Sequence, residues 1–219
     1  MGMLSGSGIG PHPQPATLSP PPPTPSPQPA MKPLRTFVAV EIAEEASGKI
    51  DRLIKRLSHI DAGVKWVAGE NLHLTLKFLG DVPAEQVPEI CDCVTQAAAG
   101  HAPFKLECCE LGAFPDITRP RTVWVGAGDG SEAVQRLQES VESGLDLIGF
   151  RPERRRFHPH LTIGRARRGG PGLAQLGEAI DSERGFQAGQ TLVDEVVVFS
   201  SELGPGGPTY TPLARVPLG

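Results

Sequence analysis

The sequence predicts an α+β domain with two pseudo-symmetric lobes, whose mainly antiparallel sheets form a central groove with the helices on the outside. First, segments typical of strands and of amphipathic helices mix along the chain without the strict alternation of a parallel sheet. Second, a motif occurs twice, as His-Leu-Thr-Leu at 73–76 and His-Leu-Thr-Ile at 160–163, 87 residues apart. Each copy lies in a strand-like segment with helices nearby, which indicates two lobes related by a pseudo-two-fold axis.

The first half of the chain gives two strands and two helices. Residues 35–42 are rich in β-branched and aromatic side chains and predict a strand. Apolar residues then recur at the i, i+3, i+4, i+7 spacing of one helical face between 50 and 57. The first histidine motif begins a strand over 73–79, and the helical spacing returns between 87 and 94.

The second half continues in the same mixed manner. Apolar residues at helical spacing predict a third helix, and a weaker pattern predicts a fourth. In chain order we expect strands at about 104–113 and 121–127, a helix over 134–145, a strand at 159–166, a helix near 173–182, and strands at 193–200 and 209–216.

The N-terminal residues 1–33 differ from the rest in composition. They are dominated by proline, glycine and serine, with four consecutive prolines at 20–23. Such a stretch buries little apolar area, so we expect a disordered, partly polyproline II tail. Two explanations stay open: a ligand for a proline-binding module, or a start codon assigned too early, with Met31 as the first residue. We expect the folded domain to span 34–219.

The charge of the chain restricts how it could bind nucleic acid. A net charge of −4 gives no overall field that would hold a polyanion, so binding would depend on a local site. Arginines crowd around the second histidine motif, which favours a phosphate-facing surface over an ordinary solvated loop. They are Arg151, Arg154, Arg155 and Arg156 before the motif and Arg165, Arg167 and Arg168 after it.

The four cysteines do not have the spacing of a structural zinc site. Cys91 and Cys93 are separated by one residue, and Cys108 and Cys109 are adjacent. We interpret them as small buried hydrophobic residues in a reducing compartment. The chain has no run of about twenty apolar residues, and its N-terminus lacks a signal-peptide pattern, so we expect a cytoplasmic location.

The twin motifs predict a cluster of chemically active side chains. Residues two apart in a strand share a face, so His73 lies beside Thr75 and His160 beside Thr162, while the intervening apolar residues point into a core. Two such strands facing across a groove would present two imidazoles and two hydroxyls to one ligand. One histidine could take a proton from water while the other protonates a leaving oxygen, and the threonines could bind phosphate oxygens.

With these residues in view, the chain resembles the 2H phosphoesterase superfamily, specifically the RNA 2′,3′-cyclic phosphodiesterase (2′-5′ RNA ligase) family. The resemblance covers nearly everything from Leu34 to Leu218. It rests on the segments 35–40, 64–67, 71–80, 157–165, 193–201 and 210–218.

The resemblance implies hydrolysis of a 2′,3′-cyclic phosphate to a 2′-phosphate, without metal or other cofactor. It implies that His73 is the proton donor, His160 the proton acceptor, Arg165 a phosphate-binding residue and Phe78 a partner for the nucleobase. The expected substrate is an RNA with a 2′,3′-cyclic phosphate end or a cyclic nucleotide. We expect a monomer with no membrane association, no obligate protein partner and possible 2′-5′ ligase side activity.

Strand parity opposes two of these roles. Phe78 is an odd number of residues from His73, and Arg165 is an odd number from His160, so ideal strands would turn both away from the groove. A bulge or a strand end could bring them back.

Other functions compete with this one. His158 and His160 form a His-x-His pair that could share a metal, but the remaining histidines do not cluster and Asp-rich motifs are absent. We therefore interpret His158 as structural or supporting. The chain has no Gly-x-Ser-x-Gly elbow and no P-loop. A non-catalytic RNA-end or nucleotide binding module, and a related enzyme acting on another cyclic phosphate, stay open.

Overall fold

The computed structural model describes residues 1–2, 32–167, 169–205 and 207–219. The chain divides into two units, Met1–Ala30 and Met31–Gly219, and the second contains all the elements described here. The predicted tail over 1–33 lies outside the described residues except at its ends, as does Arg168. The boundary of the domain at residue 34 stays a prediction.

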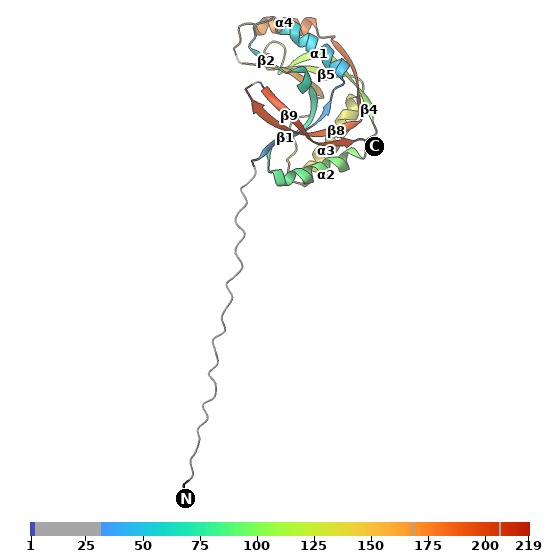
Figure 1. Ribbon diagram of the computed structural model, residues 1–219. Coiled ribbons are helices and arrows are strands. Elements are labelled where there is room, and N and C mark those ends of the chain that lie inside the picture. The colour runs from blue at the N-terminus through green and yellow to red at the C-terminus, as the bar shows by residue number, and fades with distance from the viewer. Residues whose placement is uncertain (3–31, 168, 206) are drawn as a thin grey trace. The chain divides into compact units, whose positions relative to one another are not determined.

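Within the described residues, nine strands form one curved sheet in which every neighbouring pair is antiparallel (Figure 1). The strands are β1 (Leu34–Glu41), β2 (Val64–Trp66), β3 (His73–Val82), β4 (Phe104–Phe114), β5 (Thr122–Ala127), β6 (His160–Ala166), β7 (Gln187–Val193), β8 (Glu195–Gly204) and β9 (Gly207–Pro217). The helices are α1 (Glu44–Leu57), α2 (Val87–Ala98), α3 (Ser131–Leu147) and α4 (Leu173–Ser182), with short 3₁₀ turns at Gly69–Asn71 and Ala84–Gln86. None of these helices is long and apolar enough to cross a membrane.

The two halves of the sheet exchange strands. The strand order is β7-β4-β5-β6-β3-β1-β8-β9, with β2 added beside β6. The chain runs β1-α1-β2-β3-α2-β4 in its first repeat and β5-α3-β6-α4-β7-β8 in its second, followed by β9. Yet β4 pairs with β5 of the second repeat, and β8 pairs with β1 of the first. The halves meet where β3 and β6, the two histidine strands, lie side by side.

The helices cover one face of each half. α2 and α3 pack together, with α2 against β8 and β9 and α3 against β3, whereas α1 contacts β7 and α4 contacts β4. Figure 1 accordingly shows α1 and α4 together at one end of the folded unit and α2 and α3 at the other. The helical stripes predicted from the sequence are buried here against the strands, in one large core.

The opposite face of the sheet carries a second, smaller apolar cluster. Phe37, Ala39, Val197 and Phe199 are buried together there, with Tyr210 packed against them. This face has no helix over it in the contacts described above, so the polar residues that share it with the cluster are open to a ligand.

The predicted α+β class, the antiparallel sheet and the four helices are confirmed. Two strands were missed. β2 is only three residues long, too short for alternation to show, and β7 (Gln-Ala-Gly-Gln-Thr-Leu-Val) is largely polar and contains Gly189 at φ +110°. The strand predicted at 193–200 begins instead at Glu195. The expectation that the histidine strands face each other across a groove is wrong, because they are neighbours in one sheet.

Gly164 in β6 allows β2 to lie close to that strand. A Cβ added at this position would come within 2.6 Å of Cε3 of Trp66 and 2.8 Å of Cγ1 of Val64. Both neighbours belong to β2, which pairs with β6 from Val64–Ala166 to Trp66–Gly164. A side chain at Gly164 would therefore push the two strands apart.

Gly164→Ala should destabilise the fold, because the added methyl group overpacks the contact with β2. We expect a loss of about 1–3 kcal/mol of unfolding free energy, which in a chain of this size lowers Tm by roughly 2–4 °C per kcal/mol. Thermal unfolding followed by circular dichroism measures it. Gly100→Ala is the matched control, since an added Cβ there meets nothing within 4 Å. Equal Tm values for the two variants would contradict the close packing.

Candidate active site

The register of β3 against β6 brings the twin motifs together. Leu74 is paired with Leu161, and both are fully buried in the helix-covered core. In an antiparallel pair this register sets His73 opposite Thr162 and Thr75 opposite His160, all on the other face. Diagonal neighbours of this kind lie about 7–8 Å apart. The two imidazoles therefore stand close together, with a hydroxyl beside each.

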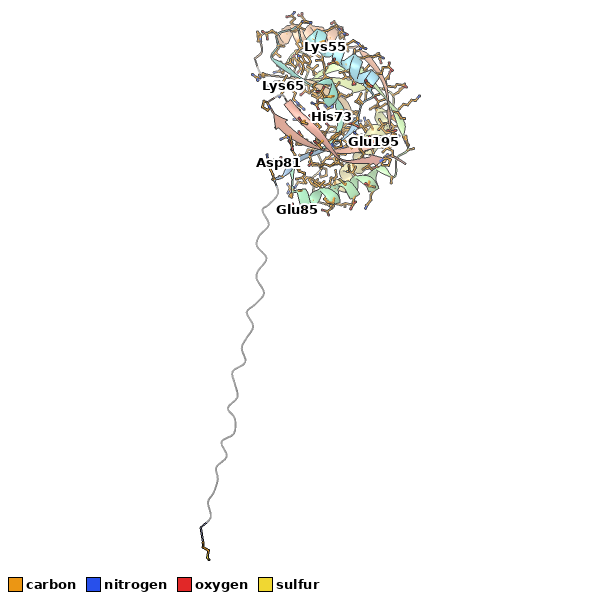
Figure 2. The ribbon with its side chains drawn as sticks, in the orientation of Figure 1. Lys55, Lys65, His73, Asp81, Glu85 and Glu195 are labelled. Atoms are coloured by element: carbon orange, nitrogen blue, oxygen red, sulfur yellow. The ribbon has the colours of Figure 1, made fainter. Side chains whose placement is uncertain are left out.

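Two adjoining cavities open on this face. One, of about 280 Å³, contains His73, and the other, of about 270 Å³, contains His160. Both are lined by Thr75, Phe78, Thr162 and Arg165. All six residues expected from the sequence thus line one continuous groove. Figure 2 shows His73 near the middle of the folded unit in this view, with Lys55 and Glu85 toward its two ends.

A bulge in each histidine strand turns Phe78 and Arg165 toward the groove. Two successive residues of β1 pair with Lys77 and Thr75 of β3, so that Leu76 has no partner there. In the same way, two successive residues of β5 pair with Gly164 and Thr162 of β6, and Ile163 is skipped. The two consecutive residues at each bulge are both buried, so the alternation shifts by one residue after them. The bulges occupy equivalent positions in the two repeats and remove the parity objection.

The two histidine rings are held by equivalent hydrogen bonds. Nδ1 of His73 lies 2.8 Å from the carbonyl oxygen of Asn71, and Nδ1 of His160 lies 2.6 Å from that of His158. A carbonyl oxygen can only accept, so each Nδ1 carries a proton and donates it. Nε2 of each ring is therefore the nitrogen that gains or loses a proton.

Aromatic side chains support each ring from one side. The His73 ring lies 4.9 Å from the Phe37 ring and meets Tyr210 edge-on at 5.2 Å. The His160 ring meets Phe114 edge-on at 5.1 Å and lies 6.1 Å from His158. These contacts limit the orientations open to both imidazoles.

The aromatic packing differs between the halves because the central ring differs. Phe37 pairs with Phe199 on β8 and stacks on it at 5.2 Å. Trp124 occupies the equivalent place in β5, where its partner on β4 is Gly112. A Cβ on Gly112 would lie 2.3 Å from Cζ2 of Trp124, so the larger indole fits only over a glycine.

Burial lowers the pKa of both histidines. For His73, burial is the main cause; the bond to Asn71 raises the pKa, the charge of Arg165 lowers it, and Glu41 raises it. For His160, burial is again the main cause; the bond to the His158 carbonyl raises the pKa, and the charges of His158 and Arg165 lower it. His73 therefore has a carboxylate acting on it that His160 lacks.

The groove also contains positive charge from two strands. Arg165 lines both cavities, and Arg35 lies over the Phe78 ring with its guanidinium carbon 4.8 Å from the ring centroid. Arg155 lines the His160 side. Groups of this charge attract an anionic ligand to this face.

Sequence reasoning did not assign Arg35, Phe37 or Tyr210 to the site. They come from β1, which pairs with β3, and from β9, which pairs with β8. Both positions depend on long-range pairing, so no local pattern marks these residues. Their only signal was that all three fall in segments that carry the family resemblance.

His158 packs among aromatic rings, which agrees with its interpretation as structural or supporting. It meets Phe114 edge-on at 5.5 Å and Trp124 at 5.3 Å. Over the described ranges, no three His, Cys, Asp or Glu side chains gather in a group that could hold a metal ion.

All four cysteines are free, and the prediction that they are buried holds for Cys108 and Cys109 only. Cys108 and Cys109 are buried, which raises the pKa of each thiol to about 11, whereas Cys91 and Cys93 are only partly buried.

Comparison with known proteins agrees with this geometry. The family model described as LigT like Phosphoesterase matches twice, over residues 40–124 and 125–210, so each repeat carries one match. The chain belongs to this family. Its relatives include a protein from Methanothermobacter thermautotrophicus named RNA 2′,3′-cyclic phosphodiesterase, which is 38% identical over 81% of this chain and 95% of that protein. A relative of the same name from Archaeoglobus fulgidus is 37% identical over 82% of this chain and 98% of its own length.

Solved structures give the same result for this LigT-like phosphoesterase. A Thermus thermophilus protein superposes with a TM-score of 0.70 at 29% identity, covering 84% of this chain and 98% of that protein. The E. coli LigT structure complexed with 3′-AMP superposes with a TM-score of 0.68 at 28% identity, over 85% and 98%.

Both histidines of this LigT-like phosphoesterase should titrate below the reference pKa of ~6.5, because burial disfavours their charged forms. NMR titration of the ring Cε1 protons of the free protein measures this, with the single variants His73→Gln and His160→Gln to assign the signals. Inorganic phosphate should raise both midpoints, since an anion stabilises the imidazolium.

The same shift makes stability depend on pH. Each folded-state pKa lies below the unfolded value, so the unfolded chain binds more protons in the interval between them. Stability should therefore fall as pH drops from about 6.5 toward the folded values, and the slope should be smaller in the double Gln variant. An NMR titration midpoint at or above about 6.5 for both rings in the free protein would contradict the claim that burial lowers their pKa values.

Proposed function

We propose that this LigT-like phosphoesterase hydrolyses the 2′,3′-cyclic phosphate of RNA ends or nucleotides to a 2′-phosphate, by acid–base catalysis with His73 and His160. The observation that carries the proposal is the pair of equivalent imidazoles, each with Nδ1 bound to a carbonyl, on one face of two adjacent strands. The name shared by the relatives from Methanothermobacter and Archaeoglobus supports this substrate.

The reaction needs two proton transfers at one phosphorus. Nε2 of His160 takes a proton from a water molecule, whose oxygen attacks the phosphorus. The bond to the 3′ oxygen breaks, and Nε2 of a protonated His73 gives its proton to that oxygen. The product has a 2′-phosphate and a free 3′ hydroxyl, and the two rings exchange protons with solvent before the next turnover.

The surroundings of the rings support these opposite roles. Glu41 is paired with His73 across β1 and β3, and its charge favours a protonated ring. For His160 it is instead the charge of His158 that favours a neutral ring, whereas Arg165 lowers the pKa of both rings. A bound phosphate anion would raise the pKa of both rings, which helps His73 to hold the proton that it donates.

The other four groove residues have roles that follow from their chemistry. The hydroxyls of Thr75 and Thr162 can donate to non-bridging phosphate oxygens and set the phosphorus between the rings. Arg165 lies on the surface of both cavities and can pair with the same oxygens as charge builds up. The face of Phe78, which is 44% exposed, can stack on a nucleobase. The monomeric state and the cytoplasmic location stay predictions.

The protein should convert 2′,3′-cyclic nucleotides to 2′-monophosphates in excess EDTA, because the protons move through imidazoles alone. Phosphorus NMR or chromatography against 2′- and 3′-monophosphate standards identifies the product. A 3′-phosphate product would overturn the assigned leaving group. Loss of turnover in EDTA with recovery on adding zinc or manganese would overturn the metal-free mechanism, and a lack of turnover with binding intact would favour the non-catalytic module.

His73→Ala and His160→Ala should each lower kcat by roughly 10²–10⁴-fold, the usual contribution of a positioned acid or base. The double variant should be little worse than either single one, because the pair acts as a unit. His59→Ala is the control: it removes an imidazole outside the groove-lining residues described above. Near-normal turnover by either single variant would show that the pairing of acid and base is wrong.

A further inference from the structure

The second repeat lacks a counterpart of the short strand β2. In the first repeat, Val64–Trp66 pairs with β6 beside the groove, with Lys65 opposite Arg165 and Trp66 opposite Gly164. The positions 87 residues later are Arg151, Pro152 and Glu153, and they form no strand. Pro152 has no N–H with which to donate a ladder bond.

A buried ion pair takes the place of the missing strand pairing. Nζ of Lys77 lies 2.6 Å from Oε1 of Glu142 and donates to the carbonyl oxygen of Arg151 at 2.8 Å. The same Glu142 oxygen accepts the backbone N–H of Glu153 at 2.5 Å. Its other oxygen accepts from Gln138 at 2.5 Å. Two side chains thus hold both a carbonyl and an N–H of one short segment.

The bulge in β3 makes this clamp, formed by Lys77 and Glu142 around the backbone of residues 151–153, possible. Lys77 occupies the position equivalent to Gly164 and is only 3% exposed, because the bulge turns it inward next to Leu76. Burial of an ion pair carries a desolvation cost that its attraction does not always recover. The Lys77–Glu142 pair is therefore better explained by its hold on the backbone of residues 151–153 than by a gain in stability.

The clamp positions a strongly basic segment at the edge of the groove. Glu153, Arg155 and Phe157 line the cavity that contains His160. The side chains of Arg151, Arg154, Arg155 and Arg156 are exposed. In the part of the chain that the structure describes, none of these four guanidinium groups pairs with a carboxylate, and Glu153 is the one acidic residue among them.

We propose that Arg151–Arg156 is the docking surface for the RNA strand on the 5′ side of the cyclic phosphate, and that Lys77 and Glu142 are positioning residues for it. The inference rests on the proposed function. When a cyclic end lies between the histidines, the preceding nucleotides leave the groove across its edge, and each carries one phosphate. Because the protein has a net charge of −4, only a local basic surface can hold them.

The test compares two substrates that share the reacting group. One is a 2′,3′-cyclic mononucleotide, and the other is an oligoribonucleotide of about ten residues with the same cyclic end. The measured quantity is the ratio of kcat/KM for the oligonucleotide to that for the mononucleotide, at several salt concentrations. The ratio should decrease with salt in the wild-type protein, since phosphate contacts release counterions.

Arg154→Gln/Arg156→Gln should lower this ratio at least about tenfold at low salt, and flatten its log–log salt slope by roughly 0.7 for each phosphate that the protein no longer neutralises. The control, Arg136→Gln/Arg184→Gln, removes the same charge from exposed positions where the arginines pair with Glu132 and Asp181. It should keep the wild-type ratio. An unchanged ratio in the first variant, or an equal fall in both, would overturn the docking surface.

The clamp is tested by Lys77→Met/Glu142→Gln, which changes both partners so that no buried charge is left alone. We expect a raised KM for the oligonucleotide, a kcat on it close to wild type and a ratio reduced as in the arginine variant. A purely structural role would instead lower turnover of both substrates together with Tm, and this result would overturn the positioning role.

If the double variant does not fold, Lys77→Arg, which retains the charge, is measured in its place. It should keep the ratio within about threefold of wild type, and a tenfold fall would overturn the positioning role. If the wild-type protein turned over neither substrate, the proposed function itself would be overturned, and this outcome differs from those that test the docking surface and the clamp.

Discussion

The antiparallel pairing of Leu74 with Leu161 is the contact on which the groove depends, because it joins the two halves of the sheet and sets the register of both motifs. Both leucines are fully buried beneath the helices. A slip of one residue would move them to the open face and turn the histidines into the apolar core, where an imidazolium would lose its solvation. The hydrophobic core on one face therefore fixes the polar constellation on the other.

A regular strand could not supply the remaining groove residues. With strict alternation, residues 73, 75 and 77 would share the face, and Lys77 would stand there in place of Phe78. The bulge at Leu76 and Lys77 reverses this: Lys77 turns inward to meet Glu142, and Phe78 turns outward. In β6 the same irregularity places Arg165 in the groove and leaves Gly164 against β2. The equivalent bulges in β3 and β6 thus bring equivalent positions into the groove, where the first repeat has Phe78 and the second has Arg165.

The sequence predicted what depends on local periodicity. The four helices and the longer strands follow from apolar spacing, and the clustering of His73, Thr75, His160 and Thr162 follows from strand alternation together with the repeat. What it could not predict depends on pairing between distant segments: the exchange of β4 and β8, the short β2, and the approach of Tyr210 and Phe37 to His73. Bulges leave no reliable local pattern, and so the positions of Phe78 and Arg165 needed the three-dimensional register.

The proposed reaction needs two unequal histidines within a symmetric fold, since an acid and a base cannot start in the same protonation state. The backbone treats the rings alike, through equivalent Nδ1 bonds to the residue two positions earlier. The difference comes from side chains outside the motifs. Glu41 acts on His73, but it also pairs with Arg215, which binds Glu195 as well, so the carboxylate keeps its place at the edge of β1. His160 has a second imidazole and an arginine nearby. Arg165 lowers the pKa of both rings, whereas Glu41 raises the pKa of His73 and His158 lowers that of His160, which suits the proposed acid and base roles.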